Sequence, residues 1–451
     1  MKTHHLPRIG AILALVSLMF GCGMNMEKNY KKMRPNLLNR DFEAADKQID
    51  AVKESFYSKD NRLLYYMDKG MVLHLAKRYE DSNKFMEQAK TAAEELWTES
   101  ISANAAALMT TDNALPYPGE DFEKVAIHFV GAFNYIGLGN YEAARVEARQ
   151  IGNELQRYTQ KYAEEKAESV YKDDAFARWL SGKLAETEKG NEAINDAWID
   201  YKKAIAVYGQ DYAARYSTPV PKFVIEDALR AVTRLGSSFQ EEREELQKRF
   251  TDVKAPVVDK AMGEVVLLHM AGEAPYKIDK FWEHHTDTDI LRIAYPEFVA
   301  KPFRITGARM SAGGQEAASQ VAEPVTAIAI QNLNDHQTRI KAKAIIRAVA
   351  KFAVAKGTQA AGAKTGGNAG AAMQLGGAVF EVFNAAAEEA DKRSWITMPA
   401  AINVSRMFLP AGDTKLNVDF IADDGTVLEN TTFDVKVEAG KPVFVTYRTF
   451  Q

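Results

Sequence analysis

The sequence predicts an α+β protein: an N-terminal helical solenoid, then a small antiparallel β domain that an Ala/Gly-rich helical hairpin interrupts. Three observations predict it. A helix-period pattern recurs between residues 29 and 250, short turn-separated strand patterns fill residues 251–451, and an alanine-rich segment lies at 337–392. The chain has 451 residues, 46% of them hydrophobic and 26% charged, as is usual for globular proteins. At roughly 100–200 residues per domain, two or three domains are expected.

Residues 1–21 are predicted to be a signal peptide. Lys2 and Arg8 give a basic start, and the uncharged run Ala11–Phe20 follows. This run is shorter than the roughly 20 residues that span a bilayer, and it has the size of the apolar part of a signal peptide. Gly21 then precedes Cys22, the only cysteine of the chain. The junction resembles the lipobox of bacterial lipoproteins, although methionine stands where that family usually has leucine.

The lipobox resemblance implies that the signal is removed and that Cys22 is lipidated. Residues 22–28 would then be a linker, and the protein would be anchored in the outer membrane, facing the periplasm, because Gly23 rather than Asp follows the cysteine. A plain signal peptide or short anchor with an incidental cysteine is the alternative. The net charge of −4 does not indicate a nucleic-acid partner.

Several segments of residues 29–250 share one helical spacing. An aromatic residue just after a turn (Phe42, Tyr79 or Tyr141) is followed by packing positions at offsets of three, seven and ten. These offsets lie on one helix face. A looser copy covers 177–208, and 224–250 predicts a closing helix pair. The pattern resembles the tetratricopeptide repeat (TPR), a helix-turn-helix unit of about 34 residues whose stacks leave a concave groove. The resemblance implies binding of a protein or peptide.

The first helices of two copies carry apolar and aromatic stripes. Exposed in a groove, these side chains would suit an apolar or extended peptide. The alternative is that they form the core between helices. The candidates for partner binding in these stripes are Met67, Met71, His74, Phe129 and Phe133.

A second group of candidates surrounds a long loop predicted at residues 98–122, which is rich in Asn, Pro and Gly. Loops of this length are usually functional or disordered. Tyr117 in this loop, with Glu123 and His128 on the next helix, could recognise a partner backbone or a small polar group. Alternatively, Glu123, His128 and Arg149 hold the loop onto the helices by hydrogen bonds.

Strand patterns begin after residue 251. Residues 264–270, 290–299 and 325–333 are predicted strands, and further strands are expected in 395–413 and 414–450. The DDGT sequence at Asp423–Thr426 predicts a tight hairpin turn. Together these patterns favour a small antiparallel sandwich.

The alanine-rich segment predicts a helical hairpin at 337–392. Its first half is basic, and four cations recur at every fourth residue, as on one helix stripe. Either the hairpin packs on the sheet through small residues, or its stripe contacts a membrane surface. The membrane-contact candidates are Arg339, Lys343, Arg347 and Lys351.

Motifs for catalysis are missing from the sequence. It contains no GxSxG, GxxxxGK[ST] or HExxH pattern. His284, His285, Asp287 and Asp289 are the only cluster of metal-ligand types, and no spacing fixes a third ligand. We therefore predict no catalytic residue, no metal site, no cofactor and no enzyme activity.

Longer segments, chiefly 116–150 and 391–412, are similar to a group of uncharacterised TPR-containing bacterial outer-membrane lipoproteins. That resemblance implies location and architecture without an activity. The leading expectation is a lipid-anchored periplasmic adaptor that binds an envelope protein through its helical region. A membrane-active or oligomeric envelope component acting through the alanine-rich hairpin is the second hypothesis, and a cell-wall enzyme with an unrecognised site is the third.

Overall fold

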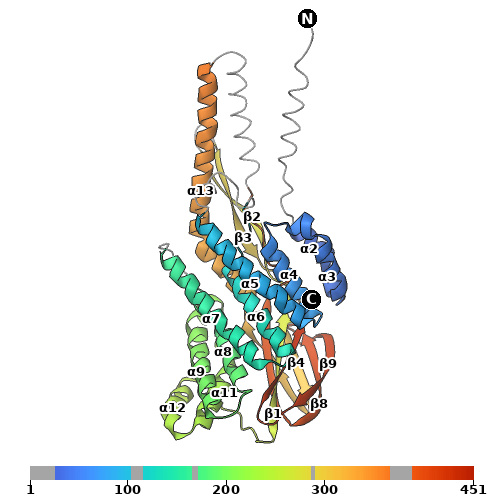
Figure 1. Ribbon diagram of the computed structural model, residues 1–451. Helices are drawn as coiled ribbons and strands as arrows, with labels where there is room; N and C mark the ends of the chain where they lie inside the picture. The colour runs from blue at the N-terminus through green and yellow to red at the C-terminus, as the bar shows by residue number, and fades with distance from the viewer. Residues whose placement is uncertain (1–25, 103–114, 165–170, 286–289, 366–388) are drawn as a thin grey trace.

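The computed structural model describes residues 26–102, 115–164, 171–285, 290–365 and 389–451. The predicted signal peptide and Cys22 lie outside these residues. The fold is α+β, as predicted. Helices occupy the first part of the chain, strands the second, and one long helix, α13, lies between strands in the sequence (Figure 1).

The helices of the first part follow one another with short turns, and each packs against the next from α4 to α9. Phe42, Tyr79 and Tyr141, the aromatic residues predicted to follow turns, are the first residues of α3, α5 and α7. The longer elements are α2 (Met26–Leu38), α3 (Phe42–Ala51), α4 (Arg62–Leu75), α5 (Tyr79–Ser102), α6 (Asp121–Gly137), α7 (Tyr141–Glu164), α8 (Ala175–Ala185), α9 (Asn191–Val207), α11 (Lys222–Leu235) and α12 (Gln240–Arg249). Short turns of helix are η1 (Lys53–Tyr57), η4 (Tyr208–Tyr212), α10 (Ala213–Arg215) and η5 (Ser237–Phe239).

Small residues let neighbouring helices approach closely. A Cβ at Gly182 of α8 would lie 2.7 Å from the Tyr201 ring of α9 and 3.1 Å from the Ala197 carbonyl oxygen. A Cβ at Gly137, the last residue of α6, would lie 2.4 Å from the ring of Tyr79. Glycine is therefore required at both positions by the packing of the facing aromatic ring.

The strands form two four-stranded sheets and a separate hairpin. One sheet has the order β10-β1-β7-β6, the other β5-β4-β8-β9, and β2 pairs with β3. The strands are β1 (Met262–Ala271), β2 (Tyr276–His285), β3 (Ile290–Val299), β4 (Gly307–Ala312), β5 (Gln315–Ala318), β6 (Gln320–Glu323), β7 (Ala401–Pro410), β8 (Gly412–Ile421), β9 (Val427–Val437) and β10 (Pro442–Arg448).

Two details of the predicted β domain are wrong. Strand β10 pairs with β1 in parallel, so the first sheet is mixed rather than antiparallel. Residues 325–333 begin α13 instead of forming a strand. Their buried apolar residues, Val325, Ile328, Ala329 and Leu333, follow helical spacing and pack with the core of the helical part. The strands at 264–270 and 290–299 and the turn at Asp423–Thr426 are confirmed.

Strand β1 contributes side chains to two hydrophobic cores, one between the two four-stranded sheets and one on the side of the helices. Val265 and Leu267 pack into the core between the two sheets, whereas Val266, Leu268 and Met270 pack against the helices. Successive side chains of a strand point to opposite faces, so both faces of β1 are buried. This explains the continuous apolar run of its sequence.

Helix α13 (Val325–Thr365) is the longest element, about 60 Å at 1.5 Å per residue. It lies along β3 and rises beside the β2–β3 hairpin (Figure 1). The first arm of the predicted helical hairpin therefore starts at 325 rather than 337, and residues 366–388, which include most of the second arm, lie outside the described residues. Among the residues that the structure describes, no helix is long and apolar enough to cross a membrane.

The predicted basic stripe of α13 is not one exposed face. Arg347 is only 5% exposed, beside Ala344 and Ala348, which pack on Ile293 of β3. Arg339 is half-buried near the Tyr162 ring, and Lys343 is exposed. Four residues turn a helix by slightly more than one full turn, so residues at this spacing shift gradually around the helix axis. By Arg347 the row of cations has reached the side of α13 that packs on strand β3. The Lys351 side chain lies outside what the structure describes.

Candidate functional site

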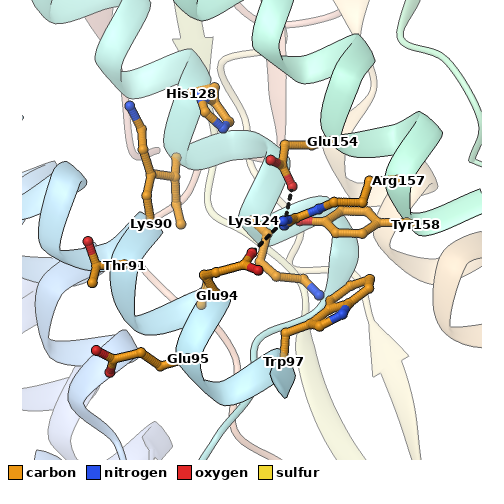
Figure 2. Close-up of a pocket in the computed structure, with 12 residues that line it drawn as sticks. Lys90, Thr91, Glu94, Glu95, Trp97, Lys124, His128, Glu154, Arg157 and Tyr158 are labelled. Carbon is orange, nitrogen blue, oxygen red and sulfur yellow. Dashed lines mark hydrogen bonds and ion pairs between the residues drawn. The ribbon is translucent and has the colours of Figure 1, made fainter. Parts of the chain in front are cut away.

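A hollow of about 400 Å³ lies between α5, α6 and α7 (Figure 2). Each of the three helices contributes one face to it. Its lining residues are Lys90, Thr91, Ala93, Glu94, Glu95 and Trp97 from α5, Lys124, Ile127 and His128 from α6, and Glu154, Arg157 and Tyr158 from α7. Among the predicted partner-binding residues, this hollow includes His128.

His128 is held in place by a chain of charged hydrogen bonds. Its Nδ1 lies 2.6 Å from Oε2 of Glu147, and Oε1 of Glu147 accepts a hydrogen bond of 2.7 Å from Lys90 Nζ. Burial alone would raise the pKa of Glu147, but the hydrogen bond from His128 and the charge of Lys90 outweigh it and lower that pKa. Glu147 is thus an ionised carboxylate at neutral pH.

The Glu147 carboxylate fixes the hydrogen on the His128 ring. A carboxylate can only accept, so Nδ1 of His128 must carry the hydrogen and donate it. In the neutral imidazole, Nε2 is then left with a lone pair. No described residue bonds to this Nε2, and the ring, 7% exposed, lines the hollow. While its ring is neutral, His128 can therefore accept a hydrogen bond from a donor that enters.

Trp97 and Tyr158 form the aromatic part of the hollow. Their rings stack with centroids 4.9 Å apart and an angle of 30°. Lys124 Nζ lies 4.5 Å from the Tyr158 centroid, and Lys161 Nζ lies 3.6 Å from that of Trp97. Cations at these distances are attracted to the ring faces, so they stiffen the aromatic pair.

The charges around the hollow are largely paired with one another. Arg157 bonds to Glu94 of α5 and, at 2.8 Å, to Glu154 of its own helix (Figure 2). Lys124 pairs with Asp121 at 2.9 Å. A strongly charged ligand would have to break such pairs, whereas a neutral hydrogen-bond donor would meet His128 at no such cost. Chemically, the site is best suited to binding a neutral polar group beside an apolar one.

The structure places all eight predicted partner-binding residues in the interior, each less than a tenth exposed. Met67, Met71, Phe129 and Phe133 are core residues, because α4 packs against α3, α5 and α6, and α6 packs against α5, α7 and strand β10. In this arrangement they do not line an open groove. The remaining four are His74, Tyr117, Glu123 and His128.

Tyr117 and Glu123 fasten the loop to the helices and to the β part. The Tyr117 hydroxyl donates to Oε2 of Glu123 at 2.6 Å, and the backbone N–H of Trp395 donates to Oε1 at 2.7 Å. Burial raises the pKa of Glu123 to about 7. These bonds support the structural alternative for Tyr117 and Glu123.

His74 lies at a second hollow of about 570 Å³, between the ends of α3 and α4 and strands β9 and β10. Its Nδ1 is 2.7 Å from Oδ1 of Asn134, and burial lowers its pKa to about 4. His74 is therefore neutral and tied to α6. This second hollow is a seam between the helical and β parts.

Sequence reasoning missed most of the residues that surround His128. Lys90, Glu94 and Trp97 recur at steps of four and three on α5, and Arg157 and Tyr158 belong to one face of α7. A search for polar and aromatic residues that share a face of two neighbouring helices could have found them.

Metal binding has no support in the described residues, which contain no group of three His, Cys, Asp or Glu side chains placed to hold an ion. The His284–Asp289 cluster extends beyond them, since 286–289 are not described. Comparison of the chain with protein-family models, with curated proteins and with solved structures finds no match.

Proposed function

We propose that the protein is a lipid-anchored periplasmic adaptor, and that the hollow between α5, α6 and α7 receives a segment of an envelope protein. The observation that carries this proposal is the Nε2 of His128, which bonds to no described residue and lines a hollow between three helices. Concave sites with an oriented polar group and aromatic walls are typical of ligand binding.

Two features of the helical part support a TPR-like description. Helices α4 to α9 pack in order, each with its neighbours, and aromatic residues open α5 and α7 where the repeat pattern places them. Stacked helix pairs of this kind commonly bind peptides. The partner segment would present a neutral side-chain donor to His128 and an apolar group to Ile127 and Tyr158.

The anchor would hold this site close to a membrane. Helix α2 begins four residues after Cys22, and four residues span at most about 14 Å. Arg34 and Tyr30 of α2 bond to Glu273 at 2.6 and 2.8 Å, so α2 is fixed to the loop after β1. Lipid on Cys22 would therefore keep the whole folded body at the membrane surface.

A photo-crosslinking amino acid at Thr91 tests the adaptor in cells. Thr91 is exposed and lines the hollow, so we expect one dominant crosslinked envelope protein. The same probe at Lys84, two turns earlier on the exposed side of α5 and outside the hollow, should give none of it. Equal crosslinking from both positions, or no protein partner at all, would refute the proposal.

A steric variant supplies the matching binding test. Thr91→Tyr fills the hollow from an exposed position and should abolish capture of the crosslinked partner, with the thermal unfolding temperature unchanged. Lys84→Tyr adds the same ring outside the hollow and should keep capture.

A second candidate function rests on the apolar surface of α13 and β2. Ile346 and Val349 of α13 are 53% and 51% exposed, and Phe281 and Trp282 of β2 are also exposed. These residues favour a membrane-contacting or oligomeric component. In that case, Cys22→Ala protein should still bind liposomes or self-associate, and Ile346→Lys should abolish it.

A further inference from the structure

Two buried carboxyl groups from distant parts of the chain meet where α8 contacts β6. Asp174 caps the N-terminus of α8 and is 0% exposed, and Glu323 ends β6 and is 2% exposed. Helix α8 and strand β6 are in contact here, and each carboxyl group acts on the pKa of the other. Two buried carboxylates at one point repel each other, whereas a carboxylic acid can donate its hydrogen to a carboxylate. The pair is therefore most stable when it holds one proton.

The other hydrogen bonds to the pair come from neutral donors. Asp174 Oδ1 accepts from the backbone N–H of Ala177 at 2.6 Å, and Oδ2 accepts from the Tyr171 hydroxyl. Glu323 Oε2 accepts from the Tyr212 hydroxyl at 2.9 Å. Among the described residues, no lysine, arginine or histidine forms an ion pair with either carboxyl. Within the described part of the chain, no ion pair therefore replaces the proton in balancing the second charge.

The titratable and charged groups around the pair are mostly neutral or acidic. Tyr171, Asp173, Tyr208, Tyr212 and Tyr216 act on one or both carboxyl groups, while Asp211, Arg215 and Asp335 lie beyond Tyr216 and Arg178 lies beside Asp173. The two arginines pair with other acids, Arg178 with Asp173 and Arg215 with Asp211. The tyrosine rings pack edge to face and exclude water from the contact.

We infer that Asp174 and Glu323 share one proton, and that this proton clamps α8 to β6 in mildly acidic solution and releases the clamp as the pH rises. The clamp bears on α13 as well. Val325, the first residue of α13, follows Glu323 by two residues, and β6 has a register shift between Val321 and Glu323. Loss of the contact between Asp174 and Glu323 would allow the start of α13 to move relative to α8.

The direction of the pH effect follows from the environment of the pair. Burial, followed by the charge of Asp174, raises the pKa of Glu323, and burial raises that of Asp174. A group whose pKa is raised by folding stabilises the folded state when the pH is below its pKa in the unfolded chain. This stabilisation is lost as the pH rises through its pKa in the folded protein. The stabilising contribution of the contact should thus be complete near pH 4, and it should be lost as the pH rises through the raised pKa values of the folded pair.

Glu323→Gln tests the shared proton directly. The amide N–H of glutamine can donate a hydrogen bond at every pH, whereas the carboxyl group of glutamate can donate one only while it is protonated. We expect the unfolding temperature of Glu323→Gln to exceed that of the wild type at about pH 8 and to approach it at about pH 5. Hydrogen exchange of residues 171–177 and 320–325, corrected for intrinsic rates, should increase with pH in the wild type and not in the variant.

Glu316→Gln is the matched control, since it makes the same change at an exposed position on the neighbouring strand β5. It should leave the pH profile of unfolding unchanged. A Glu323→Gln variant whose unfolding temperature differs from the wild type by the same amount at both pH values would overturn the inference. Equal pH dependence of exchange in both proteins would overturn it too.

Discussion

Glu123 accepts a hydrogen bond of 2.7 Å from the backbone N–H of Trp395, which lies 272 residues later in the chain. The same carboxyl accepts from the Tyr117 hydroxyl and from the backbone N–H of Glu120. One buried side chain thus ties the loop before α6 to the segment before β7. The join between the helical and β parts depends on polar bonds as well as on apolar packing.

Replacing Glu123 should therefore weaken the whole fold. Glu123→Ala leaves the Tyr117 hydroxyl and the Trp395 N–H buried without acceptors, so we expect a loss of about 3 kcal/mol in unfolding free energy. Urea denaturation measures this loss. Glu95→Ala, at an exposed residue of α5, should change the value by less than about 0.5 kcal/mol. Similar small effects from both variants would contradict the structural role of Glu123.

Lys183 should be the most costly charge to remove. Its ammonium is fully buried and lies 2.8 Å from Asp227 and 3.0 Å from Glu264, and Arg406 of β7 bonds to the same two acids. Lys183→Met leaves buried carboxylates undercompensated, so we expect a loss of about 3–5 kcal/mol. Lys415→Met, which removes an exposed pair with Asp434, should cost less than about 1 kcal/mol.

The same cluster predicts acid sensitivity. Burial opposes ionisation of Glu264, but the charges of Lys183, Arg230 and Arg406 dominate and hold its pKa well below the usual range. A carboxyl group whose pKa is lowered by folding stabilises the folded state when the pH is above its pKa in the unfolded chain, about 4. This stabilisation is lost as the pH falls through its pKa in the folded protein. We expect the unfolding free energy of the wild type to decrease below about pH 4, and Glu264→Gln to flatten this acid limb. An unchanged acid limb would argue against the cluster.

Glycine substitutions test the close helix contacts. Gly182→Ala would press a methyl group against the Tyr201 ring and a backbone carbonyl, and we expect a cost of about 1–3 kcal/mol. Gly70→Ala meets only the flexible end of Met86, which can move aside. Thermal unfolding of the two variants should rank Gly182→Ala as the less stable, and the reverse order would contradict this packing.

Cys22 carries the prediction of location. Mass spectrometry of the purified protein should show a mature chain that begins at a lipid-modified Cys22 and fractionates with membranes. Cys22→Ser should abolish processing at this site and the lipid mass. An unlipidated chain cut elsewhere would remove the basis for an anchored adaptor.

Local sequence patterns gave the elements of the fold with fair accuracy. Phe42, Tyr79 and Tyr141 begin helices, and the strands at 264–270 and 290–299 and the turn at Asp423–Thr426 lie where they were predicted, because periodicity and turn chemistry are local properties. Residues 325–333 were misread as a strand, since a short apolar run fits a buried strand or a buried helix equally well.

The candidate site was only partly accessible to sequence reasoning. His128 was a candidate from the sequence, but its contact with Glu147, and that of Glu147 with Lys90, depend on how three helices pack. The apolar stripes of α4 and α6 suit a groove or a core equally well, and only the elements packed around these two helices show the stripes to be buried.

The sequence by itself determined the class of the fold, most element positions, and the single cysteine from which a lipid anchor is predicted, since each follows from neighbouring residues. Tertiary structure decided which charges are buried together, such as Asp174 with Glu323, and that β10 returns to β1 in parallel. Such pairings join residues more than a hundred positions apart. Their energies come from burial and from the partner's charge, which no local pattern contains.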